Sequence, residues 1–274
     1  MRTALIAFLL TAPLLAQLSE PATHQKLIPT LWVQTAPEWR GLCLQTYRAA
    51  TAALDRALKD KKSTAAVEQT GNFKKLKPAI ILDIDETVLD NSPGQARQVI
   101  TRTDFQPKEW HHWVQEQQAV AIPGAAEFCQ YADRRKVKVF FVTNRDQNQK
   151  AATLANLKKA GFPTSPETLL CRGDRPEWNT SEKTARRQEI AKTYRILLLL
   201  GDDLGDFLPG VRTSIEQRAT LVAPYLENWG RKWFLLPNPG YGSWEEALYA
   251  PKRAVDPTDR VRQKERWLQP KQAQ

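Results

Sequence analysis

Three acidic residues lie within four positions of one another in the stretch AIILDIDETVLDNSP, residues 79–93: Asp83, Asp85 and Glu86. The apolar run at 79–82 comes directly before them and is typical of a buried strand. Because side chains alternate along an extended chain, Asp83 and Asp85 would lie on the same side and repel each other. A hard divalent cation removes that repulsion, and Mg²⁺ prefers oxygen ligands. The stretch therefore predicts a magnesium site at the end of a strand.

A second acidic group follows another apolar run. The stretch ILLLLGDDLGDF, residues 196–207, reads as a strand that ends in three aspartates. Asp202 and Asp206 are the candidates for the same cation, whereas Asp203 also suits a turn. Ligands of an open parallel sheet bind beyond the carboxyl ends of its strands, so acids after two neighbouring strands can share one ion. The sequence predicts that both acidic groups meet there.

Residues suited to holding a phosphate complete this pattern. Thr143 and Asn144 follow the apolar run at 137–142, and the hydroxyl of Thr143 with the backbone N–H groups after it can hold phosphate oxygens. Lys183, at the start of a predicted helix, can neutralise the remaining charge. One carboxylate can then be a nucleophile and its neighbour a general acid and base. Strand-end acids can also be plain turn residues, but their joint occurrence in this order favours phosphoryl transfer.

The elements that must position these residues alternate along the chain. A long helix is predicted at 36–59, where apolar residues recur at helical spacing. Strands separated by crossover helices indicate a parallel sheet covered on both faces, which is an α/β fold. The predicted strands lie at 79–82, 137–142, 168–171, 196–200 and 233–236, and the helices between them at 123–136, 147–160 and 181–194.

The first residues have the composition of an export signal. One arginine precedes an apolar run at 4–15, and that run is shorter than the ~20 residues needed to cross a bilayer. We expect a signal peptide at 1–16, cleaved near Ala16, and a periplasmic or secreted protein; an ordinary N-terminal apolar helix is the alternative. Since no cysteine lies near that point, no membrane anchor is expected.

The remaining composition restricts the function less. Cys43, Cys129 and Cys171 show no CxxC spacing, which argues against a zinc site and allows at most one disulfide, whose partners the sequence does not identify. The net charge of +10 favours anionic ligands. Part of it lies at 251–274, which we expect to be a basic, flexible tail. Binding of nucleic acid by that tail is a lesser alternative, and no nucleic-acid partner is expected.

Four motifs resemble those of the haloacid dehalogenase superfamily: DIDET, FFVTNRD, EKTARRQ and GDDLGDF. Flanking stretches such as DETVLDNSP and LLPNPGYGSWE narrow the resemblance to the class C acid phosphatases, also called DDDD phosphatases, a group that includes 5′-nucleotidases. The similar region covers roughly residues 31–248. It implies a Rossmann-like parallel sheet flanked by helices, with a helical cap partly formed by an N-terminal helix, in a phosphatase domain at 23–250.

The resemblance also implies roles for the candidate residues. Asp83 would attack phosphorus and form an aspartyl phosphate, and Asp85 would protonate the leaving alcohol and later activate water. Mg²⁺ would be held by the side chains of Asp83 and Asp202 and by the backbone carbonyl of Asp85, with Asp206 supporting the metal-bound waters. Three residues would bind the phosphate: Thr143, Asn144 and Lys183.

The substrate is less defined than the chemistry. Substrates of the family include nucleoside monophosphates, nicotinamide mononucleotide and aryl phosphates, so a small phosphomonoester is the expected partner. Trp110 and Tyr241 could line its pocket, although such rings also fill cores. Gly94 and Gly240 stand where relatives commonly have Tyr and Met, which could enlarge the pocket. A catalytically silent binding or storage protein, and a basic surface that binds anionic polymers or membranes, are the rival hypotheses.

Overall fold

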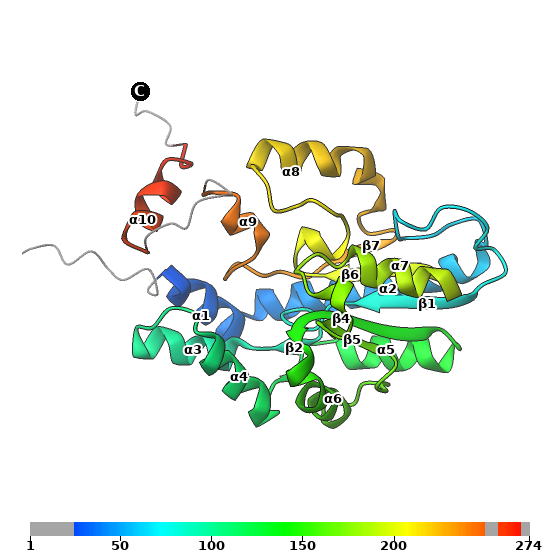
Figure 1. Ribbon diagram of the computed structural model, residues 1–274, viewed down its shortest axis with the longest axis horizontal. Coiled ribbons are helices and arrows are strands. Elements are labelled where there is room, and N and C mark those ends of the chain that lie inside the picture. The colour runs from blue at the N-terminus through cyan, green and yellow to red at the C-terminus, as the bar shows by residue number, and fades with distance from the viewer. Residues whose placement is uncertain (1–24, 250–256, 270–274) are drawn as a thin grey trace, which may run out of the picture.

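A five-stranded parallel sheet forms the centre of the computed structural model, which describes residues 25–249 and 257–269 (Figure 1). The strand order is β5-β4-β1-β6-β7, so β1 lies in the middle between β4 and β6. All four strand pairs are parallel. Each of the five strands coincides with one of the predicted apolar runs. The strands are β1 (Lys77–Leu82), β4 (Lys138–Asp146), β5 (Leu169–Arg172), β6 (Tyr194–Gly201) and β7 (Trp233–Leu235).

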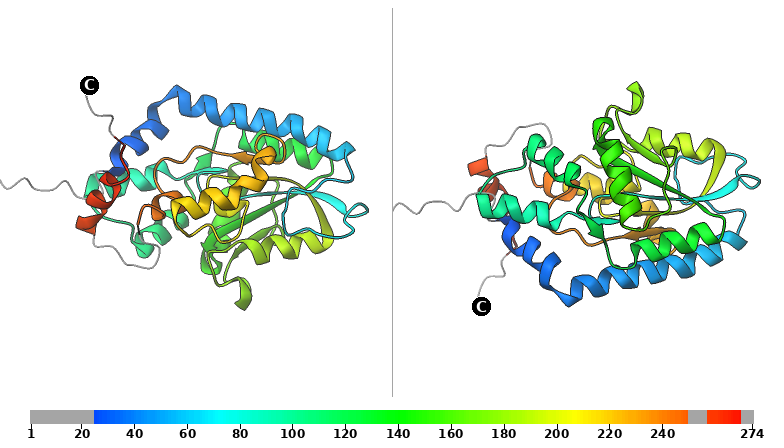
Figure 2. Two further views of the ribbon diagram at one scale, coloured as in Figure 1. Left: turned by 90° about the horizontal axis from the view of Figure 1, so that it is seen from above. Right: turned by 90° about the horizontal axis from the view of Figure 1, so that it is seen from below.

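Helices cover both faces of the sheet, as Figure 2 shows. On one face α2 (Pro37–Lys59) packs against α5 (Ala125–Arg134) and β6, and α6 (Lys150–Lys159) packs on β5. On the other face α7 (Thr184–Thr193) packs on β6. The helix α2 begins with a proline in its first turn, and it buries residues at helical spacing, among them Cys43, Tyr47 and Leu54. The predicted α/β fold with both sheet faces covered is confirmed.

A helical cap stands beyond the carboxyl edge of the sheet. It is inserted between β1 and α5 and contains α3 (Ser92–Thr101), α4 (Pro107–Glu116) and the short antiparallel pair β2 (Leu89–Asp90) and β3 (Val120–Ala121). The N-terminal helix α1 (Leu27–Thr35) packs on α3, so an N-terminal helix contributes to the cap, as expected. The helix α8 (Ile215–Val222) lies between β6 and β7 in the chain, and α9 (Ser243–Glu246) follows β7.

The C-terminal segment, which its composition predicts to be a basic, flexible tail, is described in part. Its described part contains the helix α10 (Pro257–Glu265). Lys264 Nζ contacts Glu245 Oε1 and Gln25 Oε1, each at 2.6 Å, and Trp267 Nε1 donates to the backbone oxygen of Leu248 over 3.0 Å. The described part of the tail is therefore helical and is joined to the rest of the fold by one ion pair and by the Trp267 hydrogen bond, and its flexibility stays a prediction.

Other expectations concern the N-terminus and the thiols. The predicted export signal at 1–16 lies outside the described residues. Within the described part of the chain, no helix has the length and apolar character needed to cross a membrane. Cys43, Cys129 and Cys171 are all buried and free, so the single disulfide that their number allows does not form in this structure.

Candidate active site

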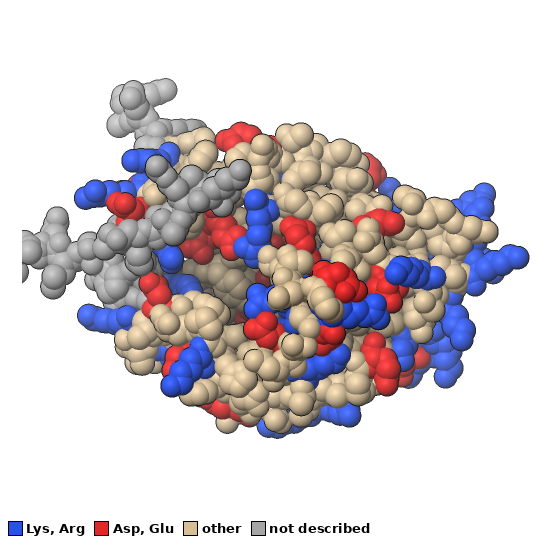
Figure 3. All heavy atoms as spheres, viewed as in Figure 1, with Lys and Arg blue, Asp and Glu red and all other residues tan. Residues whose placement is uncertain are grey.

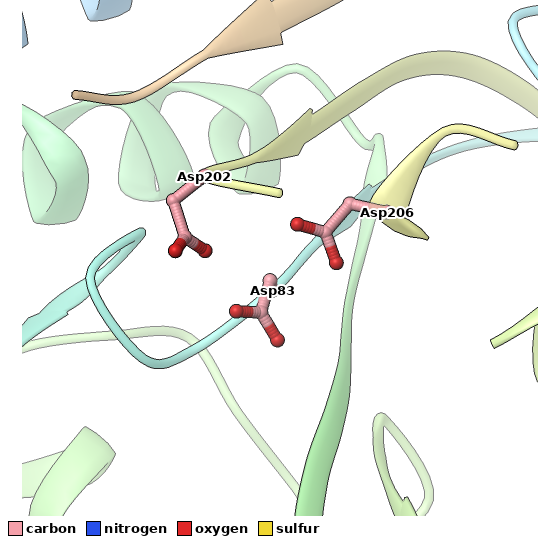
Figure 4. A group of neighbouring side chains, drawn as sticks. All are labelled: Asp83, Asp202 and Asp206. Atoms are coloured by element: carbon pink, nitrogen blue, oxygen red, sulfur yellow. The ribbon is translucent and has the colours of Figure 1, made fainter. Parts of the chain in front are cut away.

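Three of the predicted acids meet at the carboxyl edge of the sheet. Asp83 follows β1, and Asp202 and Asp206 follow the adjacent strand β6. Leu82 and Leu200 are register partners, so the chain leaves both strands at the same level. One carboxylate oxygen from each aspartate lies within 4.8 Å of the other two, and Figure 4 shows the three carboxylates turned toward one another. The predicted convergence of the two acidic groups is therefore observed.

A glycine allows Asp206 to approach so closely. A Cβ atom built on Gly201 would lie 2.3 Å from the Cβ atom of Asp206 and 2.1 Å from its Oδ2. The turn that follows holds Asp206 in place, because its Oδ2 accepts the backbone N–H of Asp203 over 3.1 Å. Asp203 in turn accepts hydrogen bonds from the backbone and hydroxyl of Ser243. Asp203 thus has the turn role that the sequence left open, and it also ties β6 to α9.

Lys183 joins two of these acids. Its ammonium nitrogen forms ion pairs with Asp83 Oδ1 and, over 2.6 Å, with Asp206 Oδ1. Burial alone would lower the pKa of Lys183, but the charges of Asp206 and Asp83 and the hydrogen bonds to them raise it above its ordinary value. Lys183 is therefore protonated at neutral pH, and it lies where a negatively charged phosphoryl group would need a cation.

One lysine does not compensate three carboxylates. The pKa of Asp83 is raised to about 7, chiefly by burial, which Lys183 opposes and to which the charges of Asp206 and Asp85 add. Burial, followed by the charges of Asp83 and Asp206, also raises the pKa of Asp202 well above its ordinary value. This excess of buried negative charge, formed entirely by carboxylate oxygens, fits a hard divalent cation such as Mg²⁺. The donor set supports the predicted metal site.

Asp85 lies apart from the three-aspartate group and is held by hydrogen bonds of its own. Arg145 Nη2 donates to Asp85 Oδ1 over 2.7 Å, and Asn91 Nδ2 donates to the same oxygen over 3.0 Å. The sequence motif TNRD contains Arg145, yet sequence reasoning assigned it no role. Arg145 is only 2% exposed, so its charge needs the carboxylate partner that Asp85 provides. Its polar neighbours in the motif gave no sign of this burial.

The predicted phosphate-binding residues on β4 occupy different positions. Thr143 is fully buried, its hydroxyl accepts the backbone N–H of Arg145 over 3.1 Å, and it is not among the residues that line the cavity. Asn144 lines the cavity, but its side-chain amide is already bonded to the backbone oxygen of Ser181 and to Arg186. The structure thus gives Asn144 a positioning contact to the segment before α7. Phosphate binding by Thr143 and Asn144 stays a prediction.

A cavity of about 940 Å³ lies between the sheet edge, the cap and α9. Asp83, Asp85 and Lys183 line it together with Trp110 and Tyr241, the two aromatic residues expected there. Figure 3 shows that this face of the molecule is hollowed, with acidic and basic side chains around the opening. The cavity is large enough for a small ligand with an aromatic or sugar group.

Glu86 is a second residue whose position sequence reasoning did not assign. Its backbone is left-handed, with φ 56°, and its buried carboxylate accepts hydrogen bonds from the Asn91 backbone and from Gln95, each over 3.1 Å. The hydroxyl of Tyr241 donates to it as well. Burial, together with Asp85 and Asp90, raises the pKa of Glu86 well above its ordinary value. Glu86 connects the β1 loop, the cap and the loop before α9.

A parallel sheet with clustered aspartates and a lysine beneath a helical cap defines a class of metal-assisted phosphoryl-transfer enzymes. A family model described as haloacid dehalogenase superfamily, subfamily IIIB (acid phosphatase), matches residues 13–244. The chain belongs to this family. Its five-stranded sheet and cap are the acid phosphatase form of the fold.

Solved structures and curated relatives agree with this assignment. The structure of the class C acid phosphatase from Bacillus anthracis superposes with a TM-score of 0.80 at 34% identity, covering 91% of this chain and 98% of that one. The same enzyme with tungstate bound gives a TM-score of 0.79 at 34% identity, over 90% and 98%. Acid phosphatase 1 of Solanum lycopersicum is 29% identical over 59% of this chain and 57% of its own. The stem 28 kDa glycoprotein of Glycine max is 30% identical over 60% of each chain. The chain thus spans about 60% of the length of these curated relatives.

Proposed function

We propose that the chain is an exported, Mg²⁺-dependent acid phosphatase that hydrolyses small phosphomonoesters, including nucleoside 5′-monophosphates, through an aspartyl phosphate. The observation that carries the proposal is the convergence of Asp83, Asp202, Asp206 and Lys183 at the base of one cavity. Membership in the acid phosphatase subfamily supplies the reaction class. The composition of residues 1–16 supports export.

The family resemblance assigns the proposed chemistry to two aspartates. Asp83 attacks phosphorus, and the bond from phosphorus to the leaving oxygen breaks as Asp85 gives that oxygen a proton. Water then attacks the aspartyl phosphate, Asp85 takes the proton from the water, and phosphate leaves as the Asp83 carboxylate is regenerated. Lys183 is fixed next to Asp83 and neutralises negative charge on the transferred group.

Magnesium fits the proposal through the donor set. The Asp83 and Asp202 side chains and the Asp85 carbonyl would hold it, and Asp206 would support its waters. When bound, Mg²⁺ would reduce the negative charge on the phosphoryl oxygens and lessen the repulsion among the carboxylates. Asp202 is already oriented for this role, because Thr87 donates to its Oδ1 over 3.1 Å and Asn238 to its Oδ2 over 2.7 Å.

The proposal that the site accepts a tetrahedral oxyanion has support from a relative. The Bacillus anthracis enzyme has been solved with tungstate bound, and tungstate has the shape and charge of phosphate. For the rest of the substrate, Trp110 and Tyr241 offer aromatic surface beside the cavity. A nucleoside monophosphate would place its base within reach of such rings, so nucleotides are a suitable class to test.

The test is release of inorganic phosphate from a panel of esters, among them p-nitrophenyl phosphate, adenosine 5′-monophosphate and glycerol 2-phosphate. We expect turnover with Mg²⁺, none after chelation, and recovery when Mg²⁺ is added back. A preference for the nucleotide would support the 5′-nucleotidase assignment. A protein that binds tungstate in calorimetry but turns over no ester would instead be the silent binding protein, and the phosphatase proposal would fail.

A further inference from the structure

The carboxylate of Asp85 is held by donors from two separate segments. Arg145, in β4, directs both Nη2 and Nε at Asp85 Oδ1, over 2.7 and 3.0 Å. Asn91, which precedes α3, donates its Nδ2 to the same oxygen over 3.0 Å. The Arg145 side chain is 1% exposed and Asn91 is fully buried. Three N–H donors from two buried side chains define the direction of this carboxylate oxygen far better than water would.

A tryptophan of the cap contributes the shorter of two hydrogen bonds that orient Asn91. The indole nitrogen of Trp113, in α4, donates to Asn91 Oδ1 over 2.8 Å. An indole N–H can only donate, so the amide must present its oxygen to Trp113. Its NH₂ group then faces Asp85. Arg145 Nη2 also donates to Asn91 Oδ1, over 3.3 Å, so the cap helix and β4 together set the direction of the Asn91 hydrogen bond to Asp85.

Two further contacts join α4 to the same network. The Arg145 guanidinium lies 5.5 Å from the ring centroid of Trp110, a cavity-lining residue of α4. Gly94, in α3, leaves the space that the Trp113 indole occupies, because a Cβ atom there would lie 3.1 Å from ring carbons of Trp113. The missing side chain at position 94 thus has a local reason, namely close packing of α3 on α4.

We infer that Trp113, Asn91 and Arg145 act as positioning residues that aim Asp85 at the leaving oxygen and couple that aim to the cap helix α4. The inference rests on the proposed phosphatase function. Its chemical content concerns one proton: as the bond from phosphorus to oxygen breaks and Asp83 gains the phosphoryl group, the Asp85 proton moves to the leaving oxygen. None of the three positioning residues gives or takes that proton.

The importance of this proton depends on the ester. An alkyl oxygen leaves poorly as an anion and needs the proton, whereas p-nitrophenolate leaves readily without it. A misdirected Asp85 should therefore impair alkyl esters more than aryl esters in kcat/KM, which reports the step that breaks the ester. A general loss of folding or metal would impair both esters equally. The ratio of the two kcat/KM values isolates the positioning effect.

Trp113→Phe is the principal variant, since it removes the indole N–H and keeps an aromatic ring. With Mg²⁺ present, we expect kcat/KM to fall about tenfold for glycerol 2-phosphate and about twofold at most for p-nitrophenyl phosphate. Arg145→Lys keeps the charge without the paired N–H donors. We expect it to lower kcat/KM for glycerol 2-phosphate, relative to that for p-nitrophenyl phosphate, more than Trp113→Phe does. The matched control is Trp233→Phe, which removes a buried indole bond to the Ala65 carbonyl on the far side of the sheet. Its ratio should equal that of the wild type.

Each outcome decides a separate statement. If Trp113→Phe left the ratio of the two kcat/KM values unchanged, the positioning role would be overturned, even if Arg145→Lys failed to fold. Circular dichroism and thermal unfolding of each variant show whether the compared proteins are folded. If the wild type turned over neither ester with Mg²⁺, the proposed function would fail first, and the positioning inference would fall with it.

Discussion

The Nζ atom of Lys183 lies 2.6 Å from Oδ1 of Asp206, and both side chains are at least nine-tenths buried. The pair connects the start of α7 to the turn after β6, at the carboxyl edge of the sheet. Because the same ammonium contacts Asp83, one cation lies between two acids of the proposed metal site. Its removal would leave buried carboxylates uncompensated.

Replacement of Lys183 should therefore reduce the stability of the folded state. We expect Lys183→Met to lower the free energy of unfolding by about 3 kcal/mol in metal-free buffer, because buried carboxylates lose their partner. Added Mg²⁺ should restore part of that loss, since a ligand of the folded state stabilises it. Urea denaturation with and without Mg²⁺ measures both effects.

Lys192→Met is the matched control, because this lysine lies on the same helix and its side chain is 73% exposed. Its stability should change by less than about 0.5 kcal/mol. Equal effects at positions 183 and 192 would show that the buried ion pairs carry no special stabilisation.

Gly201 should tolerate no side chain. In Gly201→Ala the new methyl group would meet Asp206 at its Cβ, which cannot move without the backbone, so Asp206 should be displaced from the acid cluster. We expect Mg²⁺ affinity, measured by calorimetry, to fall at least about tenfold, the range found for residues that orient metal ligands. Gly41→Ala, at a position in α2 with no atom within 4 Å of the new Cβ, should bind Mg²⁺ as the wild type does. Unchanged affinity in Gly201→Ala would remove this glycine from the account of the site.

Stability should decline at alkaline pH because of the buried thiols. Burial raises the pKa of Cys43 and of Cys171 from 9.0 to about 12, and the charges of Asp90 and Asp174, respectively, add to the effect. A thiol whose pKa is higher in the folded state keeps its proton there while the unfolded chain loses it. The stabilisation is complete below pH 9.0 and is lost as the pH rises from 9.0 toward about 12.

Cys171→Ala isolates the contribution of one thiol. Between pH 9.0 and 10.5, the wild type should lose about 1 kcal/mol per pH unit more than it would without this group. Urea unfolding at several pH values checks the slope, and the alanine variant should show a shallower decline. Parallel curves for the two proteins would rule out titration of Cys171 as the cause.

The sequence predicted the sheet and the acid cluster for one physical reason. Apolar runs mark buried strands, and parallel strands end at a common edge, so acids that follow two such runs must converge. Asp83 and Asp202 needed no further information to be brought together. Lys183 was found in the same way, as a basic residue at the start of a crossover helix.

The residues that were missed depend on contacts between distant segments. Arg145 reaches Asp85 across 60 positions, and Tyr241 reaches Glu86 across 155. Neither local periodicity nor residue type indicates such a partner. The ion pair of Lys264 with Glu245 likewise joins distant segments, and the charged composition of the C-terminal segment does not indicate it. The buried position of Thr143, likewise, follows from the packing of β4 and not from the motif that contains it.

The role of Asp83 as nucleophile is the claim on which the other chemical assignments depend. The direct measurement is kcat for p-nitrophenyl phosphate in Asp83→Asn at saturating Mg²⁺, with the folded state checked by circular dichroism. An asparagine keeps the size of the side chain but cannot form the aspartyl phosphate, so we predict a loss of at least about a thousandfold. A variant that retained activity close to that of the wild type would contradict the account.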